Sequence, residues 1–129
     1  MKRKTVFIAD HHREIRRAVC DFFQHHDEFR VVGEIEDGSD IIDRVAELLP
    51  DILIVDIEMP GCNGIETTRI IKDRKLPVRV LVSTMFDDPL YKARALQMRA
   101  DGVIVKASLK QSLEETLGLP PLSSRRRYP

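Results

Sequence analysis

Four polar side chains of three chemical kinds each stand near the end of a short apolar run of the sequence: Asp10, Asp56, Thr84 and Lys106. Two carboxylates brought close together repel each other unless a cation lies between them. Mg²⁺ is the expected cation, because it takes oxygen ligands and also coordinates phosphate oxygens. A hydroxyl group and an ammonium group can then bind two oxygens of a phosphoryl group. Together these groups supply what transfer of a phosphoryl group to a carboxylate requires, provided that the fold brings them together.

Each of the four residues also has an ordinary structural explanation when it is taken alone. An aspartate after a strand is often a helix cap, and a lysine at such a position is usually solvated. The prediction therefore depends on whether the four side chains meet at one edge of the fold.

The apolar runs before these residues predict strands that are buried on both faces. Segments with apolar residues at helical spacing alternate with these runs along the chain. The expected strands are residues 6–9, 29–35, 52–55, 78–82 and 103–105. The expected helices are about residues 12–25, 42–49, 64–74, 89–100 and 109–117.

Five alternations of strand and helix predict an α/β domain with a parallel sheet and helices on both faces. Because crossovers are right-handed, few topologies remain, and we expect a doubly wound five-stranded sheet in the order 2-1-3-4-5. Asp10 and Asp56 then face each other across the two central strands, where such sheets bind ligands. We expect residues 1–118 to form this domain, and residues 119–129 to be a flexible C-terminal tail or a linker remnant.

The composition excludes several classes of protein. The 129 residues include 21 basic and 21 acidic ones, so the net charge of +0 predicts neither a nucleic-acid nor a membrane partner. Two cysteines, Cys20 and Cys62, are too few for a disulfide framework. No apolar run is long enough for a membrane span or a signal peptide, so we expect a cytoplasmic protein.

Four segments resemble the receiver domains of bacterial two-component response regulators: residues 6–10, 51–61, 80–85 and 100–106. The most specific match is the run Asp-Ile-x-Met-Pro-x-x-x-Gly, which begins at Asp56. The resemblance covers about residues 4–118 and is greatest to receivers that normally precede a helix-turn-helix DNA-binding domain. It implies a flavodoxin-like receiver fold and a phosphoprotein that acts in signal transduction and transcription regulation.

The resemblance also implies a role for each site residue. Asp56 accepts a phosphoryl group from a histidine kinase. Asp10 and Asp56 bind Mg²⁺, and the backbone carbonyl of Glu58 is a further metal ligand. Thr84 contacts the phosphoryl group and moves with it, while Lys106 pairs with the phosphoryl oxygens.

The sequence departs from the family pattern at His11, which replaces a second acidic metal ligand, and at Val103, which replaces a tyrosine or phenylalanine. Imidazole is a poor ligand for Mg²⁺ and a good one for transition metals. Either His11 weakens Mg²⁺ binding and favours Mn²⁺ or another softer ion, or it points away and Asp10 alone suffices. Val103 lacks the aromatic ring that in the family moves inward together with the threonine. The last helix is also short, so we expect the family's usual partner-binding face to be truncated or used differently.

Three functions are open at this stage. The favoured one is a switch in which phosphorylation of Asp56 changes a protein-binding face. The second is a degenerate receiver that binds a partner independently of phosphorylation. The third is a small phosphohydrolase. Two features argue against it: the chain has no cap to enclose a substrate, and Glu58 stands two positions after Asp56, where aspartate-nucleophile phosphatases usually carry a second aspartate.

The favoured function implies a particular set of partners. The chain should not turn over a separate substrate. We expect a histidine kinase as partner, with a second copy of the chain and a DNA-binding effector domain missing from this sequence as further candidates. The chain itself is not expected to bind nucleic acid or a membrane.

Overall fold

The computed structural model describes residues 2–121 of the chain. These residues contain five strands: β1 (Lys4–Ala9), β2 (Phe29–Ile35), β3 (Ile52–Asp56), β4 (Arg79–Thr84) and β5 (Gly102–Val105). Five α-helices alternate with them: α1 (Arg13–Gln24), α2 (Ile41–Leu48), α3 (Gly64–Asp73), α4 (Pro89–Gln97) and α5 (Leu109–Leu117). A 3-10 turn, η1 (Lys106–Ser108), joins β5 to α5. Of the predicted tail, residues 122–129 lie outside the described part.

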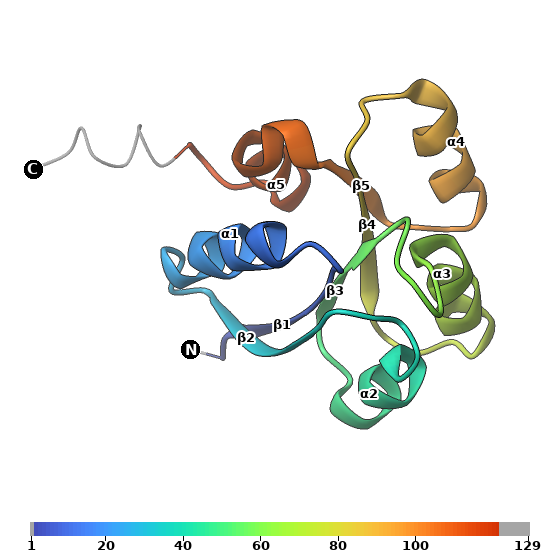
Figure 1. Cartoon of the computed structure of the whole chain (residues 1–129). Coiled ribbons are helices and arrows are strands. Elements are labelled where there is room, and N and C mark those ends of the chain that lie inside the picture. Colours follow the sequence, from blue (N-terminus) through green and yellow to red (C-terminus); the bar gives the residue numbers. More distant parts are fainter. Residues whose placement is uncertain (1, 122–129) are drawn as a thin grey trace, which may run out of the picture.

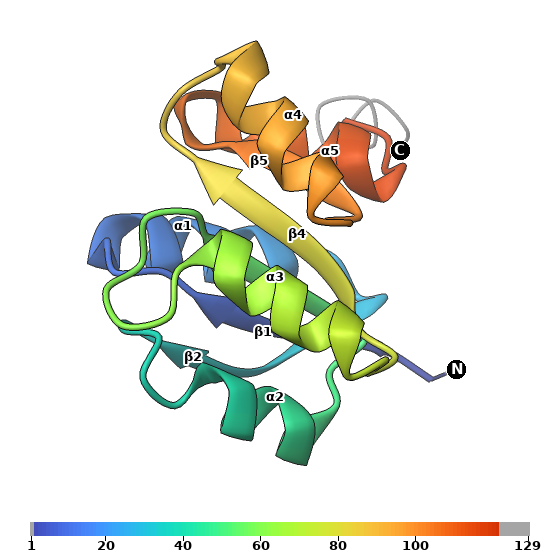
Figure 2. The same ribbon diagram turned by 90° about the vertical axis from the view of Figure 1, so that its right-hand side faces the viewer.

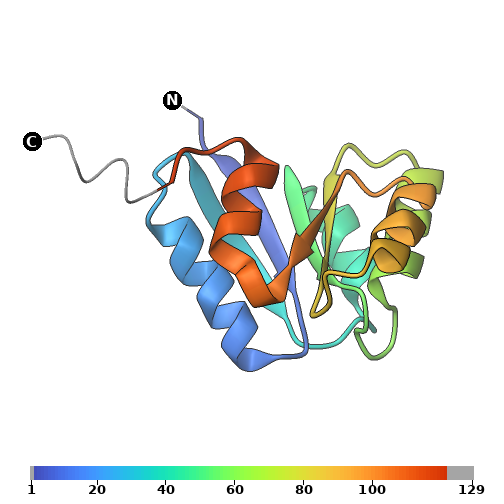
Figure 3. The same cartoon turned by 90° about the horizontal axis from the view of Figure 1, so that it is seen from above.

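The strands form one parallel sheet in the order β2-β1-β3-β4-β5, which confirms the predicted topology. Helices α2, α3 and α4 cover one face of the sheet, and α1 and α5 cover the other (Figure 1). Figure 2 looks onto the face with α2, α3 and α4, and Figure 3 shows α1 and α5 on the opposite face. All five strands therefore end at the same edge, which is where the candidate residues stand.

The central strands are buried on both faces because their side chains are apolar without interruption. In β1, Val6 and Ile8 pack toward α1 and α5, while Phe7 and Ala9 pack toward α2 and α3. All four side chains are fully buried. This alternation is the period of two residues that a strand imposes, and it explains why a continuous apolar run was required.

Local signals set the starts of the helices on either side of β4. The side chain of Asn63 accepts a hydrogen bond from the backbone N–H of Glu66 and so caps α3. Asp88 caps α4 by accepting from the N–H of Leu90, and Pro89 occupies the first turn, as the sequence predicts. In the described residues 2–121 we find no helix with the length and apolar character needed to span a membrane.

Candidate functional site

Three of the predicted site residues meet at the carboxyl edge of the sheet. Asp10 follows β1, Asp56 ends β3 and Lys106 follows β5. The ammonium nitrogen of Lys106 lies 2.7 Å from Asp10 Oδ2 and 3.1 Å from Asp56 Oδ2. All three residues are at most 5% exposed. The structure thus places the buried Lys106 ammonium between two buried carboxylates, which offsets part of the cost of burying them.

The two oxygens of Asp56 have different surroundings. Oδ1 accepts a hydrogen bond from the backbone N–H of Glu58 at 3.0 Å, whereas Oδ2 faces Lys106 and lies 2.6 Å from His11 Nδ1. Burial by itself raises the pKa of Asp56, but the Glu58 N–H, the Lys106 ammonium and the His11 hydrogen bond outweigh it. The pKa of Asp56 is therefore lower than usual, and its carboxylate is ionised at neutral pH.

Asp10 fixes the chain between β1 and α1. Its Oδ1 accepts the backbone N–H of His12 at 2.8 Å, and its backbone carbonyl accepts a hydrogen bond from Arg16 at 2.7 Å. His12 is the residue that precedes α1. The start of the helix is consequently tied to the site, so that His11 and His12 are both held near Asp10.

Two histidines cover the carboxylates on the solvent side. His11 points toward Asp56 rather than away from it, and its ring centroid is 3.8 Å from that of His12. His12 Nδ1 lies 3.2 Å from Asp10 Oδ1 and 3.7 Å from Asp56 Oδ2. The sequence reasoning did not assign His12 to the site. Its position next to His11, after a strand-end aspartate, was the only available signal.

Thr84 ends β4, one position after Ser83, which is the register partner of Asp56. The residue is 1% exposed. Its hydroxyl oxygen accepts a hydrogen bond from the backbone N–H of Phe86 at 3.2 Å. The structure therefore places Thr84 at the expected edge of the sheet. Its hydroxyl is hydrogen-bonded to the β4–α4 loop, however, and not to the carboxylates.

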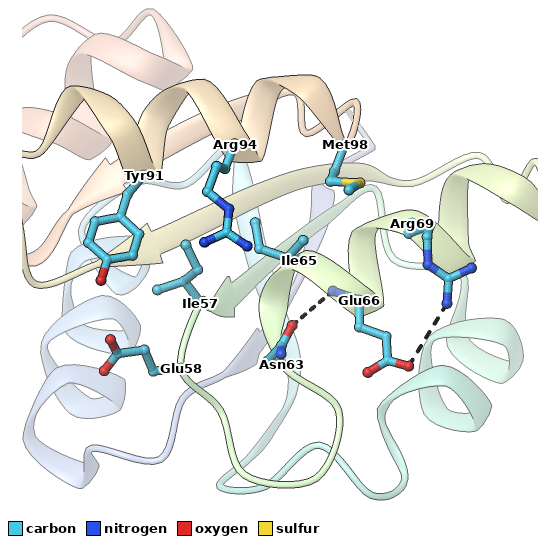
Figure 4. Close-up of a pocket in the computed structure, with 9 residues that line it drawn as sticks. All are labelled: Ile57, Glu58, Asn63, Ile65, Glu66, Arg69, Tyr91, Arg94 and Met98. Carbon is cyan, nitrogen blue, oxygen red and sulfur yellow. Dashed lines mark hydrogen bonds and ion pairs between the residues drawn. The ribbon is translucent and has the colours of Figure 1, made fainter.

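A groove lies beside the site, between α3 and α4, with a volume of about 440 Å³. Tyr91 and Arg94 reach from α4 over the loop that carries Ile57 and Glu58 (Figure 4). The side chain of Glu58 is exposed there, while its backbone N–H holds Asp56. The loop after Asp56 thus connects the site directly to the surface of α4.

The donor atoms of the site fit a divalent cation. One ligand atom each from Asp10, His11, His12 and Asp56 lies within 4.8 Å of the other three. The two carboxylates suit a hard ion such as Mg²⁺. The two imidazole nitrogens instead suit a transition-metal ion, so the ligand set is mixed in character.

The chain is similar to known signalling proteins over most of its length. Residues 6–118 match the family model of the response regulator receiver domain. The transcriptional regulatory protein DegU of Brevibacillus brevis is 34% identical over 112 residues, which are 87% of this chain and 48% of that protein. A protein-glutamate methylesterase/protein-glutamine glutaminase of Syntrophomonas wolfei is 33% identical over 115 residues, which are 88% of this chain and 33% of that protein. The chain therefore spans about half or less of the length of these relatives.

Solved structures of similar fold cover nearly the whole chain. The signal receiver domain of the putative response regulator NarL from Mycobacterium tuberculosis has a TM-score of 0.84 and 28% identity, covering 91% of this chain and 94% of that one. The isolated REC domain of RcsB from Salmonella enterica serovar Typhimurium, in the presence of the phosphomimetic BeF₃⁻, has a TM-score of 0.82 and 26% identity, covering 96% and 98%. With the strand order, the strand-end site and the family match in agreement, this chain belongs to the response regulator receiver domain family, the signalling switches of two-component systems.

Proposed function

We propose that Asp56 accepts a phosphoryl group from a histidine kinase and that its phosphorylation switches a protein-interaction face. The observation that carries this proposal is the ionised Asp56 carboxylate, held beside Lys106 and Asp10 at the end of the sheet. Oδ1 is held by the Glu58 N–H, so we assign the attack on phosphorus to Oδ2, which faces Lys106 and must first lose its contact with His11. The Oδ2–P bond forms as the bond from phosphorus to the kinase histidine breaks.

Lys106 is placed to neutralise part of the charge of the transferred group, and a bound divalent ion would neutralise the rest. The Lys106 ammonium already contacts Oδ2, so it is placed to pair with a phosphoryl oxygen when the new bond forms. Asp10, Asp56 and the backbone carbonyl of Glu58 would hold Mg²⁺, or Mn²⁺, which neutralises the remaining negative charge on the phosphoryl oxygens.

Thr84 links the phosphoryl group to the surface. Its hydroxyl proton is free to be donated to a phosphoryl oxygen, because in the structure its oxygen acts as the acceptor for Phe86 N–H. Movement of Thr84 toward the phosphoryl group would pull on Phe86, whose ring stacks against Tyr91 of α4 with centroids 6.3 Å apart. Phe86 and Leu90 are 56% and 65% exposed. This surface can report phosphorylation without a large ring at Val103.

The larger protein context follows from the relatives. A structural neighbour from Staphylococcus aureus, with 28% identity and a TM-score of 0.80, is described as a DNA-binding response regulator of the LuxR family. We infer that this receiver acts with a DNA-binding effector domain, that a second copy of the chain is a candidate partner, and that it turns over no separate substrate. Residues 1–118 would form the receiver unit, and residues 119–129 a tail or linker.

The test is incubation with a small phosphodonor and Mg²⁺, read by the mass of the intact protein. The proposal expects a gain of one phosphoryl group in the native chain and none in Asp56→Asn. A degenerate receiver is the second candidate, because His11 covers Oδ2 at 2.6 Å and leaves Asp56 only 2% exposed. No labelling with either Mg²⁺ or Mn²⁺ would support that candidate and refute the first. Repeated turnover of a phosphate ester would instead indicate an enzyme.

A further inference from the structure

The imidazoles of His11 and His12 give this centre a ligand set that oxygen-based Mg²⁺ binding does not use. We propose that Asp10, His11, His12 and Asp56 form a closed four-coordinate site for a transition-metal ion of the Zn²⁺ type, and that this ion blocks phosphoryl transfer to Asp56. The binding part stands on the geometry of the four residues alone. The blocking part rests on the function proposed above.

The distances between the donor atoms suit such an ion. Zn²⁺ bonds to nitrogen and oxygen are about 2.0–2.2 Å long, so neighbouring ligand atoms in a tetrahedral site lie about 3.4 Å apart. The pairs His11 Nδ1–Asp56 Oδ2, His12 Nδ1–Asp10 Oδ1 and His12 Nδ1–Asp56 Oδ2 are 2.6, 3.2 and 3.7 Å apart. These distances bracket the required separation, and all four ligand atoms lie within 4.8 Å of one another.

Access and charge also favour an incoming cation. The side chains of His11 and His12 are 33% and 43% exposed, whereas those of Asp10 and Asp56 are nearly buried beneath them. An ion therefore reaches the carboxylates from the solvent through the two imidazoles. When the two imidazoles bind as neutral ligands, the two carboxylates and the Lys106 ammonium carry a net charge of −1. A bound divalent ion changes this net charge to +1.

Lys106 can stay in place on one side of such a site. Its ammonium is 2.7 Å from Asp10 Oδ2, whereas the ligand atom of Asp10 that lies near His12 is Oδ1. Binding therefore requires Lys106 to give up two contacts, with Asp56 Oδ2 at 3.1 Å and with His12 Nδ1 at 3.3 Å, while its ion pair with Asp10 Oδ2 can remain. The remaining ion pair with Asp10 would orient that carboxylate from behind, as outer partners of metal ligands commonly do.

The number of protein ligands explains why the two kinds of ion have opposite effects. Mg²⁺ is octahedral, prefers oxygen and keeps several positions for water or phosphate oxygens. A Zn²⁺ ion held by four protein ligands has no open position. It also occupies Asp56 Oδ2, while the other oxygen of Asp56 is held by the Glu58 N–H. The ion would therefore remove both the nucleophile and the place for the phosphoryl oxygen.

Metal binding is tested first, without any phosphodonor. Zn²⁺ affinity is measured by competition with a chromophoric chelator, in a background carrying Cys20→Ser and Cys62→Ser so that the thiols do not contribute. We expect one equivalent to bind the native site, and His12→Ala to weaken Zn²⁺ binding by at least about 10-fold. His25→Ala is the matched control, because His25 is exposed and bonded to the Asp21 carbonyl instead.

A spectroscopic measurement reports the coordination directly. Co²⁺ absorbs visible light much more strongly in a tetrahedral site than in an octahedral one. The native chain should show the strong spectrum and His12→Ala should lose it, with metal-free circular dichroism confirming that both are folded. Equal Zn²⁺ affinities in the two proteins, or a weak octahedral Co²⁺ spectrum in the native chain, would overturn the site.

The effect of Zn²⁺ on phosphorylation is tested by incubating the protein with the phosphodonor and Mg²⁺, with and without added Zn²⁺, and measuring the labelling of Asp56. One equivalent of Zn²⁺ should suppress labelling of the native chain, and His12→Ala should require about 10-fold more Zn²⁺ for the same suppression. Tight Zn²⁺ binding with undiminished labelling would overturn the block alone. No labelling with Mg²⁺ alone would refute the proposed function and the block together, while the Zn²⁺ binding result would be unaffected.

Discussion

Replacing Lys106 by methionine removes the ammonium that contacts both Asp10 and Asp56. The side chain of Lys106 is fully buried, and both carboxylates are nearly so. Breaking a buried ion pair by removing one partner costs about 3–5 kcal/mol, because the remaining charge stays buried and uncompensated. For the 120 described residues the entropy of unfolding is about 0.25 kcal/mol/K, so the midpoint of thermal unfolding should fall by about 12–20 °C.

The loss should depend on pH in a direction set by Asp56. In the native chain the pKa of Asp56 is lowered, so its stabilising contribution is present at neutral pH and disappears as the pH falls through that lowered pKa. In Lys106→Met the ammonium no longer opposes burial, which raises the pKa of Asp56. The carboxylate then destabilises the fold at neutral pH and is relieved by protonation. The difference in unfolding free energy should therefore be largest near neutral pH and shrink toward about pH 4.

Urea unfolding with a metal chelator present measures the effect, and Lys110→Met is the control because Lys110 is exposed on α5. The control should change stability by less than about 0.5 kcal/mol. Adding Asp56→Asn to Lys106→Met, or replacing the chelator by Mg²⁺, should restore part of the lost stability because each reduces the uncompensated charge. The reasoning is refuted if Lys106→Met costs less than about 1 kcal/mol, or if neither treatment restores stability.

Three further perturbations test separate parts of the structure. Burial, with the hydrogen bond to Glu34, raises the pKa of Cys20 to about 12, so alkylation at pH 8 should be about 1000-fold slower than at an ordinary thiol. Glu34→Gln should accelerate it, as followed by mass mapping. A Cβ at Gly38 would lie 2.2 Å from the Cys62 carbonyl oxygen, so Gly38→Ala should cost at least about 1–3 kcal/mol in urea unfolding; a cost below about 0.5 kcal/mol would contradict this packing. His11→Asp should raise Mg²⁺ affinity by supplying an oxygen ligand in place of imidazole. If the variant binds Mg²⁺ as tightly as the native chain does, and the same holds for Mn²⁺, His11 does not set the metal preference.

The sequence by itself determined the elements and their order. Uninterrupted apolar runs require burial on both faces, and the alternation with amphipathic helices leaves a parallel sheet as the fold. Residues such as Asp88 and Pro89 act within one turn of the chain, so the start of α4 was also predictable. Because the strands of a parallel sheet end at one edge, the meeting of Asp10, Asp56 and Lys106 followed from the topology.

Only the tertiary structure decided which atoms of the site touch. Lys106 and His12 are 94 positions apart in the chain, yet their nitrogens lie 3.3 Å apart. Likewise, the hydroxyl of Thr84 is joined to the N–H of Phe86 rather than to the carboxylates. A strand end fixes where a backbone stops, but the direction of each side chain beyond it depends on neighbours that arrive from other strands. Those neighbours are distant in sequence, and no local pattern records how their side chains share the space at the edge of the sheet.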